Sequence, residues 1–242
     1  MVVAARTINE GDNRIPGSIA TTVKRIREEG GTAIGVRCDV TVDEEIEELV
    51  KKTLDEFGQV DILVNNAAIY PPGNILEVQI RHWDLTYRIN VRGPFVACRA
   101  VLPHMIKRRW GHIINISGSA SKGPGAGPYD SDSVSTYPGF TTSGSSKAAL
   151  DRFTQGLAHE AFQHNIAANV LLPSRSIASE GTAYHSGGVE AMKGAYVNGQ
   201  IMADAAVAIC SKDPRSFTGN ILTDEEVLRG EGMNISSYPV IT

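Results

Sequence analysis

Short apolar runs alternate with longer amphipathic stretches along this chain. The short runs are rich in Val, Ile and Leu, which favours β-strands, while the longer stretches repeat apolar residues three and four positions apart, which predicts helices. The predicted strands cover residues 2–5, 32–36, 60–64, 112–116, 166–172 and 220–222, and the predicted helical stretches begin near 18, 41, 76 and 146. This alternation is typical of βαβ units and predicts an α/β fold with a doubly wound parallel sheet.

Local signals mark where the helices begin and end. Ser18 is a candidate N-cap for the first helix, and Gly30 follows its last apolar position. Thr41 with Glu44 has the spacing of a capping box, which predicts the start of the second helix. Gly58 follows that helix where a left-handed residue is favoured. The third stretch is long, and we expect continuous helical structure from about 76 to 108.

Composition narrows the class of protein. The 242 residues are 42% hydrophobic and 21% charged, as in an ordinary globular domain, so we expect a single domain over residues 1–242. A net charge of -4 gives no reason to expect a nucleic-acid partner. The cysteines Cys38, Cys98 and Cys210 are odd in number and widely spaced, which fits neither a disulfide framework nor a metal site. With no basic leader and no long apolar stretch, we expect a cytoplasmic protein without a membrane partner.

Polar motifs follow several of the predicted strands. The motifs occur in the order Asp39-Val40, Asn65-Asn66-Ala67, Asn90, Ser117-Gly118-Ser119 and Ser146-Lys147. Two irregular segments rich in Gly and Ser, 121–142 and 176–199, also lie downstream of strands. Ligands of open α/β sheets bind beyond the carboxyl ends of the strands, so we expect these motifs and segments to surround a site.

Together these motifs, in this order, resemble the short-chain dehydrogenase/reductase family over nearly the whole chain. The closing segment 213–220, with Asp224-Glu225 and Leu228, is similar to its hydroxysteroid-dehydrogenase-like branch. The resemblance implies a Rossmann-like fold that transfers a hydride between NADP(H) and a secondary alcohol or ketone. It also implies a small carbonyl or alcohol substrate and assembly as a homodimer or homotetramer.

The resemblance also implies which residues hold the cofactor. Arg6 ends the first predicted strand, where a basic residue pairs with the 2′-phosphate of NADP and an acidic one would favour NAD. Asp39 resembles the aspartate that binds the adenine amine, although it is also placed to bond Thr41 at the helix start. Arg6 has a simpler interpretation as a solvated residue. The implied cofactor contacts are Arg6, Asp39, Val40, Asn66, Ala67, Lys147 and Pro173.

The implied catalytic group departs from the family pattern. Lys147 resembles the lysine that lowers the pKa of a tyrosine four residues earlier, one helical turn away, but the residue there is Ser143. A serine hydroxyl is a much weaker and shorter acid than a phenol, so we expect impaired or absent activity. The segment between Gly118 and Ser143 is longer than in the family, and Tyr129 or Tyr137 within this extra loop is an alternative source of the phenol. The implied catalytic residues are Asn90, Ser117, Ser119, Ser143 and Lys147.

The glycine-rich phosphate motif of the family, Thr-Gly-x-x-x-Gly-x-Gly, does not occur in the sequence. The first predicted strand corresponds to the one after that motif, so the resemblance implies a fold lacking its first strand-helix unit, about 30 residues. In the family order 3-2-1-4-5-6-7 this loss would leave two unpaired strand edges facing each other. A natural short form and a shortened sequence both remain open, as does an engineered Ser143. A non-catalytic binding or assembly module is the alternative function.

Overall fold

The structure, a computed structural model, describes residues 1–129, 140–182, 190, 193–194 and 196–241. Its strands are β1 (Val2–Ala5), β2 (Ile34–Arg37), β3 (Ile62–Asn65), β4 (Gly111–Ile116), β5 (Ile166–Leu172), β6 (Ile177–Ala178), β7 (Val197–Asn198) and β8 (Ile221–Thr223). Its α-helices are α1 (Ile19–Glu28), α2 (Asp43–Phe57), α3 (Ile80–Tyr87), α4 (Gly93–Arg108), α5 (Ser145–Ala161), α7 (Gln200–Cys210) and α8 (Asp224–Gly230). Every predicted strand is confirmed, with ends that agree to within two residues.

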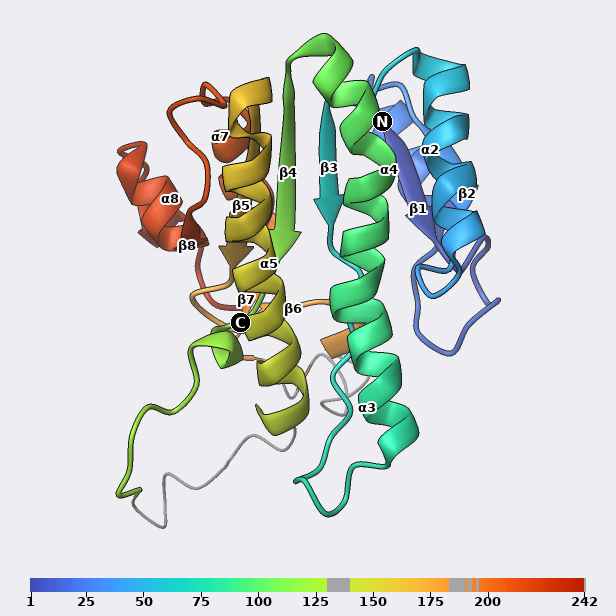
Figure 1. Cartoon of the computed structure of the whole chain (residues 1–242). Coiled ribbons are helices and arrows are strands. Elements are labelled where there is room, and N and C mark those ends of the chain that lie inside the picture. Colours follow the sequence, from blue (N-terminus) through green and yellow to red (C-terminus); the bar gives the residue numbers. More distant parts are fainter. Residues whose placement is uncertain (130–139, 183–189, 191–192, 195, 242) are drawn as a thin grey trace.

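The described strands form a split parallel sheet. One part is the pair β1-β2, and the other has the order β3-β4-β5-β8 (Figure 1). A small third pair, β6-β7, lies beyond the carboxyl ends of the larger strands. Neither β1 nor β3 has a hydrogen-bonded partner strand on its second edge within the described residues, and the arrows of both strands point the same way in Figure 1. The expected pair of facing, unpaired edges is therefore present.

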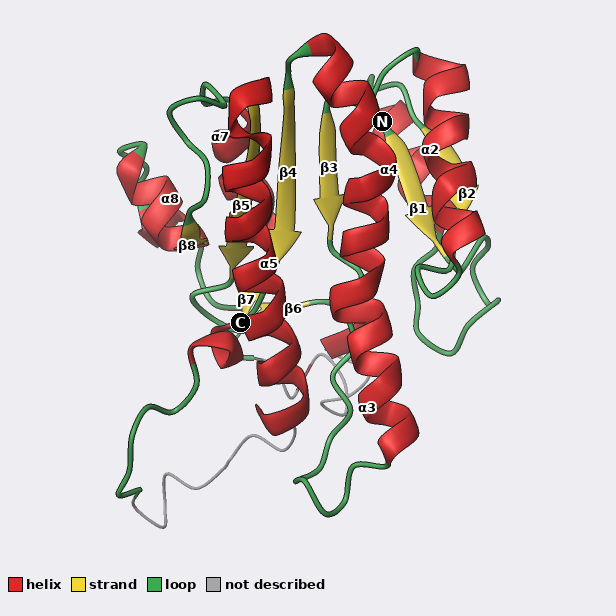
Figure 2. Ribbon diagram, viewed as in Figure 1, coloured by secondary structure: helices red, strands yellow, loops and turns green. Residues whose placement is uncertain are grey.

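Helices cover both faces of the four-stranded part (Figure 2). Successive residues of β4 point to opposite faces, as a strand requires, so that Ile113 packs with α2, α4 and α5 while Ile114 packs with α7 and α8. Both side chains are fully buried, with 0% exposure. The pair β1-β2 has a much smaller core, in which Ile19 and Val23 of α1 cover Ala33. The main hydrophobic core thus lies in the four-stranded part.

The starts and ends of α1 and α2 test the local signals. Ser18 caps α1 by accepting a bond from the Thr21 backbone N–H at 3.0 Å, as predicted. Gly58 ends α2 in the left-handed region, with φ of 74°, also as predicted. The capping box at Thr41 is wrong, because the N-cap of α2 is Val42, one residue later than predicted, and it makes no side-chain cap bond. The Thr41 hydroxyl instead donates to Asp39 at 2.8 Å.

The expected continuous helix from 76 to 108 is interrupted. A π-helical turn, η1 (Arg88–Arg92), separates α3 from α4. π-turns inside helices are rare and occur often at functional sites. Asn90 lies in the middle of this turn and is fully buried.

The two Gly/Ser-rich segments contain short elements where they are described. These are the 3₁₀ turn η2 (Ser119–Lys122), the π turn η3 (Phe140–Gly144) and the strands β6 and β7. The 3₁₀ turns η4 (Phe162–His164) and η6 (Ile235–Ser237) follow α5 and α8. Among the described residues, no helix is both long and apolar enough to cross a membrane.

Candidate functional site

A cavity of about 350 Å³ opens at the carboxyl ends of β1, β2 and β3. It brings together five of the residues predicted to hold a cofactor, although they come from three separate loops. Those residues are Arg6 after β1, Asp39 and Val40 after β2, and Asn66 and Ala67 after β3. A basic group, a carboxylate and two small or polar residues around one hollow can accommodate the adenosine end of a dinucleotide.

Asp39 is held in place by the start of α2. Its Oδ1 accepts bonds from the Thr41 backbone N–H at 2.9 Å and from the Thr41 hydroxyl at 2.8 Å. Burial raises the pKa of Asp39, but the two bonds from Thr41 and the charges of Arg6 and Arg37 outweigh it, and the net pKa lies below the ordinary value. Asp39 is thus an anchored carboxylate that stays ionised at neutral pH. Both interpretations of Asp39, helix partner and adenine contact, are compatible with this geometry.

A buried chain of amides fixes the turn after β3. The Asn65 side chain donates to Asn115 Oδ1 at 2.8 Å, and the Asn115 amide donates to the Thr154 hydroxyl at 2.8 Å. Asn115 and Thr154 both have 0% exposure. These bonds join β3, β4 and α5 just below the cavity. Neither Asn115 nor Thr154 is among the predicted site residues, although a polar residue inside an apolar strand, such as Asn115, indicates such a network.

Asn90 connects the same turn to α5. Its Oδ1 accepts from the Ile69 backbone N–H at 2.9 Å, and its Nδ2 donates to the Ile69 carbonyl at 2.9 Å and to Ser146 Oγ at 3.0 Å. An amide nitrogen has two protons to donate. Both are committed here, so the side chain of Asn90 positions the loop after β3 against the helix that carries Lys147.

Lys147 points toward the end of β4. Its Nζ donates to the Ile116 carbonyl at 2.6 Å. Burial lowers the pKa of Lys147 to about 8, and the nearby Asp151 partly opposes this effect. Asp151 lies one turn further along α5 with 7% exposure. It is not among the predicted site residues, although its four-residue spacing from Lys147 places the two side chains on one face of the helix.

The serines lie around Lys147 in different environments. Ser143 is half-buried in η3, and its backbone carbonyl accepts from the Ser146 hydroxyl at 2.7 Å. Ser117 is buried with 6% exposure, and its Oγ has no hydrogen-bond partner among the described residues. Ser119 is exposed at the start of η2. A Cβ added at Gly144 would lie 2.8 Å from the Ala120 carbonyl oxygen, so η3 packs closely on η2.

Tyr129 and Tyr137 are the two tyrosines of the extra loop, within the segment 121–142. Tyr129 is 53% exposed, and its hydroxyl donates to the Gly125 carbonyl at 2.5 Å. This bond holds the phenol within its own loop. Tyr137 lies outside the described residues.

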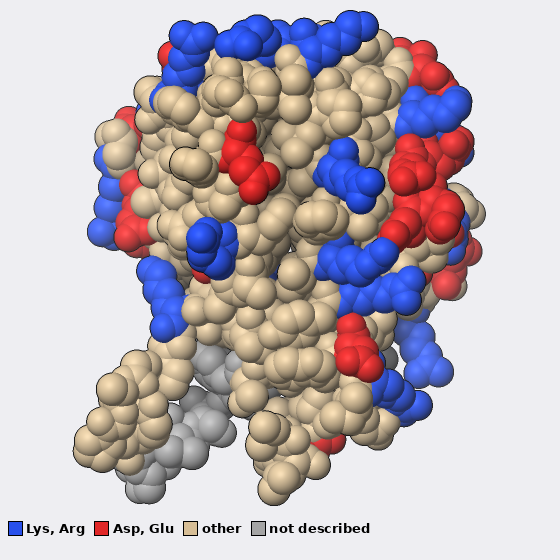
Figure 3. Space-filling model, in the orientation of Figure 1, with Lys and Arg blue, Asp and Glu red and all other residues tan. Residues whose placement is uncertain are grey.

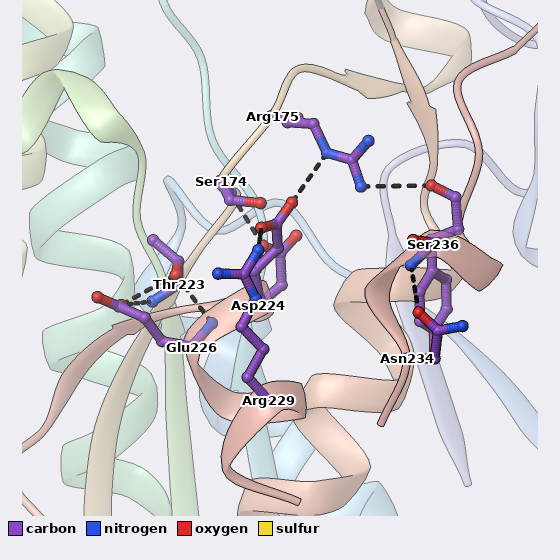
Figure 4. Close-up of polar contacts among 10 residues, drawn as sticks. Ser174, Arg175, Thr223, Asp224, Glu226, Arg229, Asn234 and Ser236 are labelled. Carbon is purple, nitrogen blue, oxygen red and sulfur yellow. Dashed lines mark hydrogen bonds and ion pairs between the residues drawn. The ribbon is translucent and has the colours of Figure 1, made fainter. Parts of the chain in front are cut away.

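Pro173 lies apart from the adenosine-end cavity, at the end of β5, and is not among the described residues that line it. The next two residues join β5 to α8. The Ser174 backbone N–H donates to Asp224 Oδ1 at 2.9 Å, and Arg175 forms an ion pair with Glu225 at 3.0 Å (Figure 4). Asp224 has 0% exposure, so this segment is firmly anchored.

The start of α8 in Figure 4 has the capping box that the start of α2 lacks. Glu226 Oε2 accepts from the Thr223 backbone N–H at 2.7 Å, and Thr223 Oγ1 accepts from the Glu226 N–H at 3.2 Å. No group of three or more His, Cys, Asp or Glu side chains is arranged for a metal ion in the described ranges.

Comparisons with known proteins agree with this geometry. Hydroxysteroid dehydrogenase-like protein 2 of Bos taurus is 34% identical over 246 residues, which cover 99% of this chain and 54% of the relative. The chain thus spans about half the length of that relative. A crystal structure of a short chain dehydrogenase from Mycobacterium thermoresistibile is 29% identical with a TM-score of 0.83, covering 98% of this chain and 80% of that one.

A metagenomic short-chain oxidoreductase in complex with NADP has the same fold, with a TM-score of 0.69, 24% identity and coverage of 92% of this chain and 83% of that one. The family model of the short chain dehydrogenases matches residues 13–180, more than half of the sequence. The fold, the order of the motifs and these matches agree, and the chain belongs to the short-chain dehydrogenase family.

Proposed function

We propose that this chain binds NADP(H) at the cavity between β1 and β3 and represents an oxidoreductase of secondary alcohols or ketones whose hydride transfer is impaired. The observation that carries the proposal is the convergence of Arg6, Asp39, Val40, Asn66 and Ala67 on one cavity. Three loops far apart in sequence supply these residues. Their chemistry also fits the parts of an adenosine 2′-phosphate.

Each group in the cavity has a distinct role in this proposal. The Arg6 guanidinium would bind the 2′-phosphate, which makes NADP the preferred cofactor over NAD. The anchored carboxylate of Asp39 would accept from the adenine amine, and Asn66 and Ala67 would lie against the ribose. The metagenomic short-chain oxidoreductase, whose crystal structure is a complex with NADP, supports NADP as the cofactor class. With no glycine-rich phosphate motif in the sequence, we expect weak affinity for the whole dinucleotide.

The residues around Lys147, where the substrate would react, form the reaction end of the proposed site. They explain why we expect hydride transfer to be impaired. When bound, NADPH supplies a hydride from C4 of the nicotinamide to a carbonyl carbon. The carbonyl oxygen then needs a proton, and the nearest groups in this chain are Ser143, a hydroxyl of the Ser117 region and Lys147. Serine is too weak an acid for this role. The Lys147 ammonium, held by the Ile116 carbonyl, can supply charge and pass protons onward but lacks an acidic phenol beside it.

Adenosine fragments test the cofactor proposal without needing the phosphate motif. Calorimetric titrations should show adenosine 2′,5′-bisphosphate binding about 10-fold or more tighter than AMP, since one charge-assisted bond contributes about 1.5–3 kcal/mol. Arg6→Ala should remove this difference and leave AMP binding unchanged. Arg14→Ala, in the exposed loop after β1, is the matched control and should keep the difference. Equal affinities in the unmodified chain would refute the role of Arg6 and the preference for NADP.

The surface around Phe95 and Phe153 favours a second candidate function, assembly of this chain with further copies of itself. Phe95 of α4 is 48% exposed and lies 5.9 Å from Phe153 of α5, measured between ring centroids. The two rings line a groove together with Tyr87, Val91 and the charged residues Asp84, Arg88 and Arg92. Figure 3 shows this face as mainly uncharged surface with charged side chains scattered over it. Pairing of this face with a second copy would produce the homodimer or homotetramer.

Sedimentation tests assembly separately from cofactor binding. Phe95→Glu should shift a dimer or tetramer to the monomer, because it places a charge in an apolar contact. Phe162→Glu is the control, since Phe162 is similarly exposed, at 52%, but lies at the far end of α5. A monomeric unmodified chain, or equal effects of the two variants, would exclude this surface.

A further inference from the structure

Asp151 is a buried carboxylate to which the proposed reaction gives no role. It lies on α5, which packs against β4 and β5 (Figure 1), and it has 7% exposure. Its Oδ1 has no hydrogen-bond partner among the described residues. Taking a carboxylate out of water without a hydrogen-bond partner is costly. Packing alone therefore does not explain an aspartate at this position.

The helix places Asp151 next to Lys147. Residues four positions apart lie on the same face of an α-helix, so these two side chains are neighbours on α5. The Lys147 Nζ donates to the Ile116 carbonyl at 2.6 Å, which fixes the direction of the lysine side chain. A carbonyl is neutral, so this bond leaves the positive charge of Lys147 without a counter-ion.

The described elements packed against α5 offer no other counter-ion. These elements are η1, α4, β4, η2, η3, β5 and η4, and none of them contains an acidic residue. Apart from Cys98, the titratable side chains of α4 are Arg, Lys or His. Those of the other elements are Arg88 and Arg92 of η1, His112 of β4, Lys122 of η2 and His164 of η4.

The remaining charged or titratable side chains of α5 itself are directed away from Lys147. Arg152, His159 and Glu160 are all exposed, whereas Asp151 is buried. Burial lowers the pKa of Lys147 to about 8, and the charge of Asp151 acts in the opposite direction. Burial and position on the helix thus both distinguish Asp151 from the other acidic residue of α5.

We propose that Asp151 is a positioning residue for Lys147, whose buried carboxylate keeps the lysine side chain an ammonium ion while the Ile116 carbonyl holds its Nζ. Charges interact more strongly in the protein interior than in water, so the effect does not need a direct contact. The catalytic value of this charge rests on the proposed function, in which Lys147 supplies charge and passes protons. The charge itself does not depend on whether NADP(H) binds.

An NMR titration of the full chain with ¹³C-labelled lysine tests the charge state of Lys147 directly. Lys147→Arg identifies the signal by its loss. Asp151→Asn keeps the size of the side chain and removes its charge, so it should lower the pKa of Lys147 by at least about 0.5. Asp151→Glu keeps the charge and should restore most of this difference.

A matched control separates Asp151 from the net charge of the chain. Glu160→Gln removes one negative charge from an exposed position of the same helix, and it should change the pKa of Lys147 by less than about 0.2. The effect of Asp151→Asn should also persist in about 0.5 M salt, because salt screens buried charges much less than exposed ones.

Urea unfolding of the same variants separates this role from a purely structural one. Asp151→Asn should lower the urea midpoint more at about pH 6.5, where Lys147 is charged, than at about pH 9.5, where it is largely neutral. The dependence on pH should disappear when Lys147→Met is added. A structural role of Asp151 predicts the same change of the midpoint at both pH values.

Three results would overturn the proposal. The first is the same pKa of Lys147 in the unmodified chain and in Asp151→Asn, and the second is an equal fall in Glu160→Gln. The third is a loss of stability in Asp151→Asn that does not depend on pH. None of these measurements uses a nucleotide. If adenosine 2′,5′-bisphosphate fails to bind while Asp151→Asn still lowers the pKa of Lys147, the cofactor proposal alone is refuted.

Discussion

The two parts of the split sheet carry opposite ends of the proposed site and differ in how they are stabilised. The β1-β2 part supplies Arg6 and Asp39 but has a small core built around Ile19. The four-stranded part supplies Lys147 on α5 and has large cores on both faces. The residues proposed to discriminate between cofactors therefore lie on the part with the smaller core. The part with the large cores holds the proposed reaction end, where Ser143 stands four residues before Lys147.

The largest expected effect restores the acid on the well-packed side. Ser143→Tyr should raise the turnover of a simple ketone with NADPH by about 10²–10⁴-fold, compared at equal cofactor occupancy, because general acid catalysis typically contributes that much. Position 143 is one turn before Lys147, so a phenol there reaches the field of the ammonium. Steady-state NADPH oxidation measures the change.

Two variants control for this effect. Ser145→Tyr puts the same phenol at a neighbouring serine and should leave the rate at background. Lys147→Ala, added to Ser143→Tyr, should abolish the gain. If Ser143→Tyr stays at background while nucleotide still binds, the reaction end is deficient beyond one residue, and assembly becomes the better account of the chain.

Matched core variants compare the two parts directly. Ile113→Ala in β4 should lower the free energy of unfolding by about 2–5 kcal/mol, the usual cost of a cavity in a close-packed core. Ile19→Ala in α1 should cost less than about 2 kcal/mol, because its cluster is small and its neighbours Val3 and Ile26 are only partly buried, so the site can collapse. Urea unfolding monitored by circular dichroism gives both values. Equal costs would mean that β1-β2 is as well packed as the rest.

Packing beside Ser143 gives a smaller effect. Gly144→Ala places a Cβ 2.8 Å from the Ala120 carbonyl oxygen, so η3 must move from η2, at a cost of about 1–3 kcal/mol. Gly156→Ala, in the adjoining helix α5, meets Arg152 at an ordinary 3.6 Å and should stabilise by about 0.5–1 kcal/mol. Opposite signs in thermal unfolding are expected. A stabilising Gly144→Ala would show that the contact between η2 and η3 yields easily.

The smallest effect is a pH dependence of stability in β4. Burial lowers the pKa of His112 below 6.5, and the side chain is 1% exposed. The unfolded chain then takes up a proton that the folded chain does not, so stability falls as pH drops through about 6.5, by at most about 1.4 kcal/mol per pH unit. His112→Gln should flatten urea midpoints measured between pH 7.5 and 5.5. His159→Gln, at an exposed position, should not.

The sequence by itself determined the six predicted strands and the grouping of the residues proposed to hold the adenosine end, but not α7, α8 or the short strands β6 and β7. Hydrophobic periodicity is a local property, and it located the predicted strands to within two residues of their observed ends. The order of strand and motif then placed Arg6, Asp39 and Asn66 at one edge of the sheet, because parallel strands end on the same side. That Ser143 stands in place of a tyrosine is implied only by the resemblance to the family and stays a prediction.

The tertiary structure decided which partner each polar group takes. Thr41 and Glu44 have the spacing of a capping box, but the Thr41 hydroxyl donates to Asp39 instead. The turn after β2 brings the Asp39 carboxylate closer to this hydroxyl than the start of α2 is. The π turn at 88–92, the bond from Lys147 to Ile116 and the burial of Asp151 likewise depend on how α4 and α5 pack on β4. Hydrogen bonds between elements are set by distances across the packed interior, which no local pattern contains.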